Sequence, residues 1–381
     1  MWITALVNRA AALLGIVSAP ARIRRVELPR MSRAPMKVVY DSAVVHESVS
    51  WRSRVVQRAA RLMLKPLLHI APVSDRTIVW MRRTERLSAL RRRSRYVEPV
   101  RFELGGVPVE SLTHRHGPDT DLTILYLHGG GFFSCGLESH RRVCERLARK
   151  SGATVISVDY VQLPEGTVAD SVADAITAYA ALLDMSAHPD KIVVAGDSAG
   201  GYLAMKVAEI ASLRGLTPPA GVIGFSPLLS LDPDRFDKDV QRVIRARDAY
   251  LPLAKITQMR TRWMPDGARM EGEISPLDAT DRITSPTFLV AVEDEILRPE
   301  VEAMALALTA HGVEVETHLW RKQVHAFPVL GKALPESELA LQLAADFARR
   351  VIGDLDEVPV VDPHAHIETM VGETVATDRA S

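Results

Sequence analysis

The sequence contains few cysteines and has no apolar run long enough to span a bilayer. Its 381 residues include two cysteines, Cys135 and Cys144, so a disulfide framework is not indicated. The apolar stretch at residues 2–17 is interrupted by Asn8 and Arg9, and what remains is too short for a transmembrane helix. We therefore expect neither a disulfide-rich scaffold nor a membrane-spanning protein.

Clusters of metal ligands and nucleic-acid-binding motifs are also missing. The histidines at 114 and 116, and those at 364 and 366, have too few partners for a zinc site. The arginine-rich run at 91–95 is interpreted as solvated, because no nucleic-acid-binding motif accompanies it. We expect no metal, no organic cofactor and no nucleic-acid partner.

The formal net charge is zero, but the charges are unevenly distributed. Residues 1–101 hold 21 Lys and Arg against 6 Asp and Glu, and the rest of the chain holds 26 against 41. In the basic part, apolar pairs between 55 and 68 recur at helical spacing among arginines, which predicts a basic amphipathic helix that Pro66 should kink or end. We favour a cap helix laid on the acidic remainder of the chain and keep contact with an anionic membrane surface as the alternative.

The start of the chain bears on where the protein resides. Residues 10–17 and the following small residues at 19–21 resemble a signal peptide, but a single arginine precedes them. We expect a cytoplasmic protein, with peripheral membrane association as the next interpretation and secretion ranked below it. A homodimer is left open.

Apolar runs alternate with helical patterns from about residue 100 onward. Continuous apolar strands require helices on both faces, so we predict an α/β domain with a mostly parallel central sheet. The expected strands are 100–104, 122–127, 153–159, 191–196, 221–226 and 287–292, with a strand-like alternation at 313–319. The expected helices are 139–150, 168–183, 199–213, 301–311 and 337–351.

One serine stands between two glycines where an apolar strand meets a helical pattern. Residues 196–200 read GDSAG, and the flanking glycines allow a turn sharp enough to hold the Ser198 hydroxyl outward. Ser198 is therefore the candidate nucleophile. A short motif of this kind also occurs by chance, so the prediction depends on what surrounds it.

A glycine-rich loop follows the predicted strand at 122–127. Residues 128–132 read HGGGF, and backbone N–H groups without side chains in front of them can bind a developing negative charge. Acyl transfer needs such donors for the oxygen that becomes negative, and a further donor is expected from Ala199, the residue after the nucleophile.

An acid and a histidine are expected later in the chain. Three carboxylates, Glu293, Asp294 and Glu295, follow the predicted strand at 287–292. The carboxyl ends of the strands are where open α/β sheets place their functional residues. We favour Glu295 as the acid and keep Asp294 as the alternative. His325, after the strand-like alternation, is the candidate general base.

These motifs together resemble the hormone-sensitive-lipase-like carboxylesterases of the α/β-hydrolase fold, often called bacterial family IV. The resemblance covers residues 97–353 and also includes the tripeptide SPL at 275–277. It implies an α/β-hydrolase fold with a helical cap, and a nucleophile, acid and base at Ser198, Glu295 and His325. It further implies an oxyanion hole formed by Gly130, Gly131 and Ala199, with His128 bracing the loop.

The chain departs from the family pattern in three places. The family more often has aspartate at the position of Glu295, so the longer side chain must reach the histidine. Residues 159–169 lack the arginine and two prolines that the family usually has there. Ala326 replaces the glycine that commonly follows the catalytic histidine.

Five segments are predicted along the chain. Residues 1–96 form a basic helical region that is partly cap, 97–230 and 281–353 form the two parts of the hydrolase core, 231–280 form a cap insertion, and 354–381 form a mobile tail. The expected activity is hydrolysis of small-molecule or lipid carboxylic esters with short to medium acyl chains through an acyl-enzyme intermediate. The alternatives are a lipase, an amide hydrolase and a non-catalytic receptor that binds a small molecule.

Overall fold

The computed structural model describes residues 43–72, 74–85, 96–232, 235, 247–265 and 267–355. Several predictions concern residues outside these ranges. They are the signal-like segment at 10–21, the arginine run at 91–95, the histidines at 364 and 366, part of the insertion and the tail from 356 onward.

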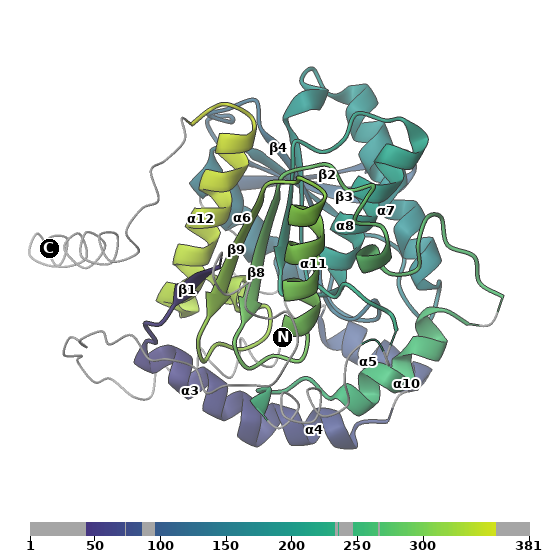
Figure 1. The fold of residues 1–381 in the computed structure, drawn as a ribbon, viewed down its shortest axis with the longest axis vertical. Helices are drawn as coiled ribbons and strands as arrows, with labels where there is room; N and C mark the ends of the chain where they lie inside the picture. Colours follow the sequence, from purple (N-terminus) through teal and green to yellow (C-terminus); the bar gives the residue numbers. More distant parts are fainter. Residues whose placement is uncertain are drawn as a thin grey trace, which may run out of the picture.

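A single nine-stranded sheet forms the centre of the protein (Figure 1), in the order β1-β9-β8-β7-β6-β4-β5-β3-β2. The strands from β1 to β5 in this order run parallel to one another, whereas β3 and β2 are antiparallel to their neighbours. The predicted mostly parallel sheet is confirmed. The strands are β1 Val44–His46, β2 Val97–Leu104, β3 Val107–His114, β4 Thr123–Leu127, β5 Thr154–Val158, β6 Ile192–Asp197, β7 Gly221–Phe225, β8 Thr287–Val292 and β9 Val315–Trp320.

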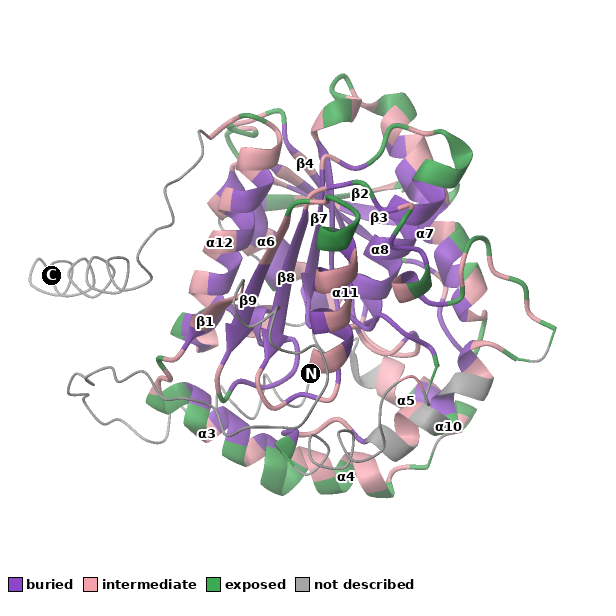
Figure 2. Ribbon diagram, in the orientation of Figure 1, coloured by how far each residue is buried: buried purple, intermediate pink, exposed green. Residues whose placement is uncertain are grey.

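Helices cover both faces of this sheet, and the strands between them are buried (Figure 2). One face packs against α6 Leu137–Ser151 and α12 Pro335–Val351. The other packs against α7 Val168–Met185, α8 Ala199–Arg214 and α11 Arg298–Ala310. The remaining helical elements are α3 Trp51–Ala59, η1 Ala60–Leu64, α4 Lys65–Ile70, α5 Asp75–Glu85, η3 Pro189–Lys191, α10 Leu253–Trp263, η4 Pro276–Asp278 and η5 Phe327–Ala333.

Two strands, β1 and β3, were not predicted from the sequence. β1 is three residues long and becomes a strand by pairing with β9, in the register Val44 to His318, which a local pattern does not reveal. β3 includes Pro108 and several polar residues and pairs with β2 and β5. Both strands depend on neighbours that only the folded sheet supplies.

The predicted end or kink at Pro66 was wrong in one respect, because helical backbone continues from α3 through η1 into α4. η1 is a π-helical turn, and Pro66 lies in the first turn of α4. The π-helical turn directly before Pro66 interrupts the regular α-helical hydrogen-bond pattern at the place where proline has no N–H to donate. The buried residues Val56 and Ala60 join the apolar core on the α6 and α12 side.

The predicted mobile tail begins at Asp354. Asp354 accepts a hydrogen bond from the Thr120 hydroxyl, and its N–H donates to the carbonyl of Arg349, so the chain is still packed at this point. In the part of the chain that the structure describes, no helix is both long enough and apolar enough to cross a bilayer.

Candidate active site

Ser198 lies in a sharp turn between β6 and α8. Its backbone angles are φ 51° and ψ −117°, a conformation that residues other than glycine rarely adopt. The surrounding structure must therefore hold the backbone of Ser198 in this conformation. The N–H of Ser198 donates to the carbonyl of Phe225 at 3.0 Å, which is one such restraint. The turn places Ser198 at the carboxyl edge of the sheet.

The glycines around Ser198 are required by close packing. A Cβ atom on Gly200 would lie 1.9 Å from the carbonyl oxygen of Leu127, and one on Gly196 would lie 2.3 Å from the carbonyl oxygen of Gly200. Neither atom fits, because the start of α8 lies directly against the end of β4. The two motifs that the sequence separates by about 70 residues are therefore in contact.

The glycine-rich loop that follows β4 contains backbone N–H groups that are not paired within the described structure. Among the described residues, the N–H groups of Gly130 and Gly131 have no hydrogen-bond acceptor. Ala199 is the first residue of α8, where an N–H has no partner within the helix. The carbonyls in the loop are occupied, since Gly130 accepts from Ser134 and Gly131 accepts from the indole of Trp263 at 2.9 Å. The loop can therefore offer N–H groups to an anion.

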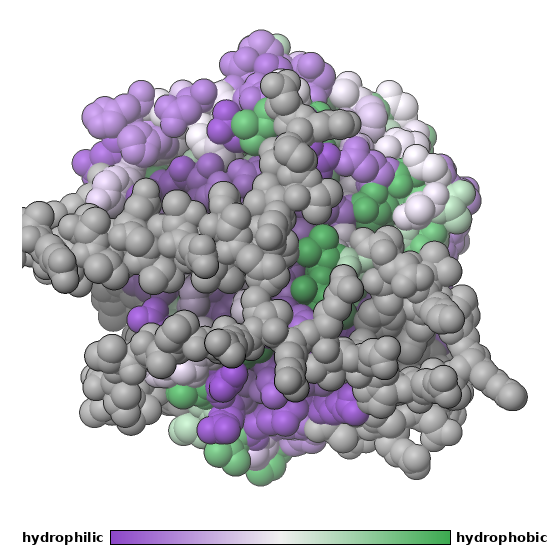
Figure 3. All heavy atoms as spheres, turned by 60° about the vertical axis from the view of Figure 1, so that its left-hand side comes forward, coloured by the Kyte–Doolittle hydropathy of each residue, from purple (hydrophilic) through white to green (hydrophobic). Residues whose placement is uncertain are grey.

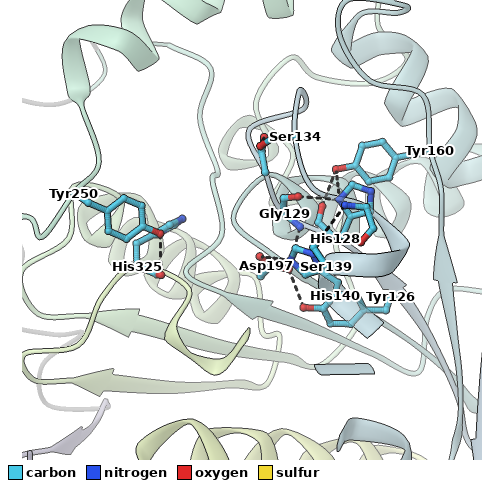
Figure 4. Close-up of polar contacts among 12 residues, drawn as sticks. Tyr126, His128, Gly129, Ser134, Ser139, His140, Tyr160, Asp197, Tyr250 and His325 are labelled. Carbon is cyan, nitrogen blue, oxygen red and sulfur yellow. Dashed lines mark hydrogen bonds and ion pairs between the residues drawn. The ribbon is translucent and has the colours of Figure 1, made fainter. Parts of the chain in front are cut away.

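Asp197, the residue before Ser198, ties this loop to the strand (Figure 4). Its carboxylate accepts hydrogen bonds from the Tyr126 hydroxyl at 2.8 Å and from the N–H of Gly129 at 3.0 Å. His140 Nε2 lies 3.3 Å from the second carboxylate oxygen. Burial alone would raise the pKa of Asp197, but His140 and the hydrogen bonds hold it below its usual value. Asp197 is therefore a buried anion that joins the turn at Ser198 to the start of the loop.

His128 lies on the other side of the loop. Its Nδ1 is 2.8 Å from the carbonyl oxygen of Gly129, and Tyr160 stacks on its ring and donates to its carbonyl at 2.7 Å. Burial and the neighbouring His140 lower the pKa of His128 to about 3, so its ring is neutral. These contacts support the predicted bracing role.

Glu295 and His325 meet although 30 residues separate them. His325 Nδ1 lies 2.9 Å from Glu295 Oε2, and the other carboxylate oxygen accepts from the N–H of Val292 at 2.9 Å. Burial would lower the pKa of His325, but the hydrogen bond and charge of Glu295 raise it above the ordinary value. Asp294 instead lines a surface pocket with basic residues. The structure thus brings Glu295, and not Asp294, to the histidine.

Two strands separate β6 from β9, yet the segments carrying Ser198 and His325 converge at the end of β7. Ser198 donates to Phe225, while the N–H of Ala326 donates to the hydroxyl of Ser226, the next residue, at 3.3 Å. Ser198, Ser226 and Ala326 all have positive φ angles, between 49° and 51°. Strained backbone at three converging positions is typical of a functional site.

Asp248 and Tyr250, which lie in the predicted insertion, also contact the site and were not predicted from the sequence. The Asp248 carboxylate accepts from the N–H of Ile296 at 2.9 Å, directly after Glu295. The Tyr250 hydroxyl donates to the carbonyl of His325 at 3.2 Å. No local motif marks either residue, because their partners are tens of residues away. Asp197 and His140 were also missed, although the position of Asp197 beside the serine was a usable signal.

Among the described residues, no group of three or more His, Cys, Asp or Glu side chains is arranged to hold a metal ion. Cys135 is partly exposed and Cys144 is buried, and neither forms a disulfide bond within the described part of the chain. Burial raises the pKa of Cys144.

Comparison with known proteins is consistent with this geometry. A family model described as alpha/beta hydrolase fold matches residues 124–329. The carboxylesterase/phospholipase LipF of Mycobacterium tuberculosis is 32% identical over 62% of this chain and 64% of its own length. The esterase LipU of the same organism is 33% identical over 61% of this chain and 80% of its own length.

Solved structures agree in fold. The hormone-sensitive-lipase homologue EstE7 from a metagenome library is 29% identical, covers 78% of this chain and 99% of its own, and has a TM-score of 0.68. An esterase of the bacterial hormone-sensitive lipase family, 22% identical with a TM-score of 0.70, supports the fold alone.

Proposed function

Since this chain belongs to the α/β-hydrolase fold family, and within it to the hormone-sensitive-lipase-like esterases, we propose that it is a serine carboxylesterase. The hydrogen bond between Glu295 and His325, beside the strained turn at Ser198, is the observation that carries this proposal. The chain spans 64% of the length of LipF, one of its curated relatives. We therefore infer the activity and the substrate class from the geometry of the site in this chain.

In the proposed mechanism, His325 acts as the general base. Its Nδ1 faces Glu295, which leaves Nε2 to take the proton from Ser198 as the hydroxyl oxygen attacks the ester carbonyl carbon. The N–H groups of Gly130, Gly131 and Ala199 stabilise the oxyanion. This role is supported by the absence of a hydrogen-bond acceptor for these groups among the described residues. The imidazolium then protonates the departing alcohol, and water repeats the cycle to release the acid.

A cap over this site is proposed to select the acyl and alcohol groups. The insertion contacts the catalytic loops through Asp248 and through Trp263 of α10, and Lys65 of α4 donates to the carbonyl of Asp248 at 2.8 Å. The helices before residue 97 and the insertion at 231–280 are therefore linked to each other and to the site. We expect short to medium acyl chains, a range taken from the family resemblance.

Peripheral membrane contact is proposed for the outer face of the N-terminal helices. Leu62, Met63, Leu67 and Ile70 are exposed there, Ile70 by 81%, among exposed arginines of the same helices. Figure 3 shows hydrophilic and hydrophobic side chains side by side on the lower edge of the molecule. Mixed basic and apolar faces of this kind bind anionic lipid surfaces.

The test of the esterase proposal is hydrolysis of p-nitrophenyl butyrate by the wild type and by Ser198→Ala. We expect kcat to fall by about 10⁴-fold or more in the variant, because the nucleophile is lost. Ser212→Ala, an exposed serine on the same helix, is the matched control and should retain activity. Comparable turnover by Ser198→Ala would overturn the mechanism, and a series from acetate to palmitate separates an esterase from a lipase.

A further inference from the structure

A surface pocket beside the loops that carry Glu295 and His325 is lined by four cations among its six residues. It has a volume of about 410 Å³ and is bounded by Arg54, Gln57, Arg58 and Arg61 of α3 and η1, and by Asp294 and Lys322 of the loops opposite. The mechanism above uses none of these side chains.

The arginines converge because of helix geometry. Arg54, Arg58 and Arg61 are spaced four and three residues apart, so they share one face of the helical segment, and all three are exposed. Like charges at this spacing repel one another and are unfavourable unless an anion lies between them.

Lys322 approaches from the opposite wall. It follows β9 in a turn and has a φ angle of 49°, in the left-handed region that lysine rarely occupies. Lys322 adds a fourth positive charge to the lining of the pocket.

These cations are not closely paired with carboxylates, although the charge of Glu293 acts on Lys322. No ion pair to a described residue is formed by Arg54, Arg58 or Lys322. Glu293 lies 3.5 Å from Arg321 instead, and Arg61 donates to the backbone carbonyl of Arg247. Asp294 is the single acid in the lining, so four cations face one carboxylate.

We propose that this pocket binds a phosphate-bearing anion. Guanidinium groups match phosphate oxygens in paired hydrogen bonds, and a phosphate group offers several cations more acceptor oxygens than a carboxylate does. The bound anion would bridge α3 to the loops on which Asp294 adjoins Glu295 and Lys322 precedes His325. Free phosphate and a lipid headgroup share this chemistry.

The test measures the melting temperature of the full chain with increasing inorganic phosphate and with chloride at equal ionic strength. A ligand that binds the folded state raises Tm in a saturable way. We expect this rise with phosphate only, and an apparent Kd about tenfold weaker or more in the double variant Arg54→Gln, Arg58→Gln. Arg52→Gln, on the same helix but outside the lining, is the matched control and should respond like the wild type.

An equal rise with chloride, or an unchanged response in the double variant, would overturn the site. If the double variant does not fold, Lys322→Gln supplies the same comparison from the opposite wall. The measurement is repeated in Ser198→Ala, so its result is independent of whether the protein hydrolyses esters.

Glycerol 3-phosphate and dihexanoyl phosphatidylglycerol distinguish the sources of the anion. Stronger stabilisation by the monoester assigns the pocket to free phosphate compounds, and stronger stabilisation by the diester assigns it to a lipid headgroup; either supports the site. Stabilisation by none of the three compounds contradicts it.

Discussion

At the scale of single residues, the site depends on which carboxylate reaches His325. Glu295 contacts the imidazole and is 1% exposed, whereas Asp294 faces the basic pocket. The side chain of Glu295 is one methylene group longer than that of aspartate, and it reaches the histidine with one carboxylate oxygen. The other oxygen accepts a hydrogen bond from the N–H of Val292. The departure from the family pattern at this position is therefore accommodated by the geometry.

Replacing each acid separately tests this assignment. Glu295→Gln should lower kcat on the order of 10³-fold or more, because the amide no longer stabilises the imidazolium. Asp294→Asn is the matched control and should stay close to the wild type. Steady-state hydrolysis of p-nitrophenyl butyrate measures both, and the reverse order of effects would transfer the role to Asp294.

The raised pKa of His325 predicts the pH dependence. His325 must be neutral to accept the serine proton, so kcat/KM should fall as the pH drops through its pKa, with a midpoint above the ordinary histidine value of 6.5. In Glu295→Gln, burial still lowers the pKa of His325 while the largest raising interactions are lost and only the weaker ones with Asp248 and Asp197 remain, so the midpoint of the residual activity should move to lower pH. A pH profile of kcat/KM with an unchanged midpoint would contradict this account.

At the scale of elements, Asp197 joins the end of β6 to the loop that follows β4. Its bonds to Tyr126 and Gly129 hold the donors of that loop in place relative to Ser198. Asp197 does not touch the reacting atoms in the proposed mechanism, so it is a positioning residue.

Asp197→Asn removes the charge that pairs with His140 but keeps the size of the side chain. We expect kcat to fall roughly 10- to 100-fold with KM little changed, because a small displacement of the loop weakens oxyanion binding in the transition state. Asp121→Asn, which breaks an exposed ion pair with Lys191, is the control. A change in KM alone would indicate a role in substrate binding instead.

At the scale of the whole molecule, the N-terminal helices have two different faces. The face with Val56 and Ala60 packs into the core, and the opposite face exposes large apolar side chains. Figure 1 shows α3 and α4 along one edge of the molecule, away from the helices that cover the sheet. This arrangement leaves the outer face accessible to a lipid surface.

The double variant Leu67→Glu, Ile70→Glu tests the membrane proposal. It should reduce co-sedimentation with phosphatidylglycerol vesicles by about tenfold or more, because two apolar side chains no longer enter the interface. Leu213→Glu, an exposed leucine on α8, is the control and should bind like the wild type. Equal loss in the control, or none in the double variant, would contradict contact through this face.

Local patterns in the sequence were sufficient for most of the sheet and for the motifs. The strands β4, β6, β7 and β8 are continuous apolar runs, and such runs are readable without knowledge of their neighbours. The turn at Ser198 and the glycine loop were equally visible, since backbone that approaches this closely admits only glycine.

Contacts between distant segments were decided by the tertiary structure alone. It brought Glu295 to His325, set Asp197 against His140, and attached the insertion at Asp248 to the acid loop. It also made a strand of β1, which pairs with β9 more than 260 residues away. Hydrogen bonds of this kind depend on the register of the whole sheet and on the burial of both partners, and neither quantity is carried by a local run of residues.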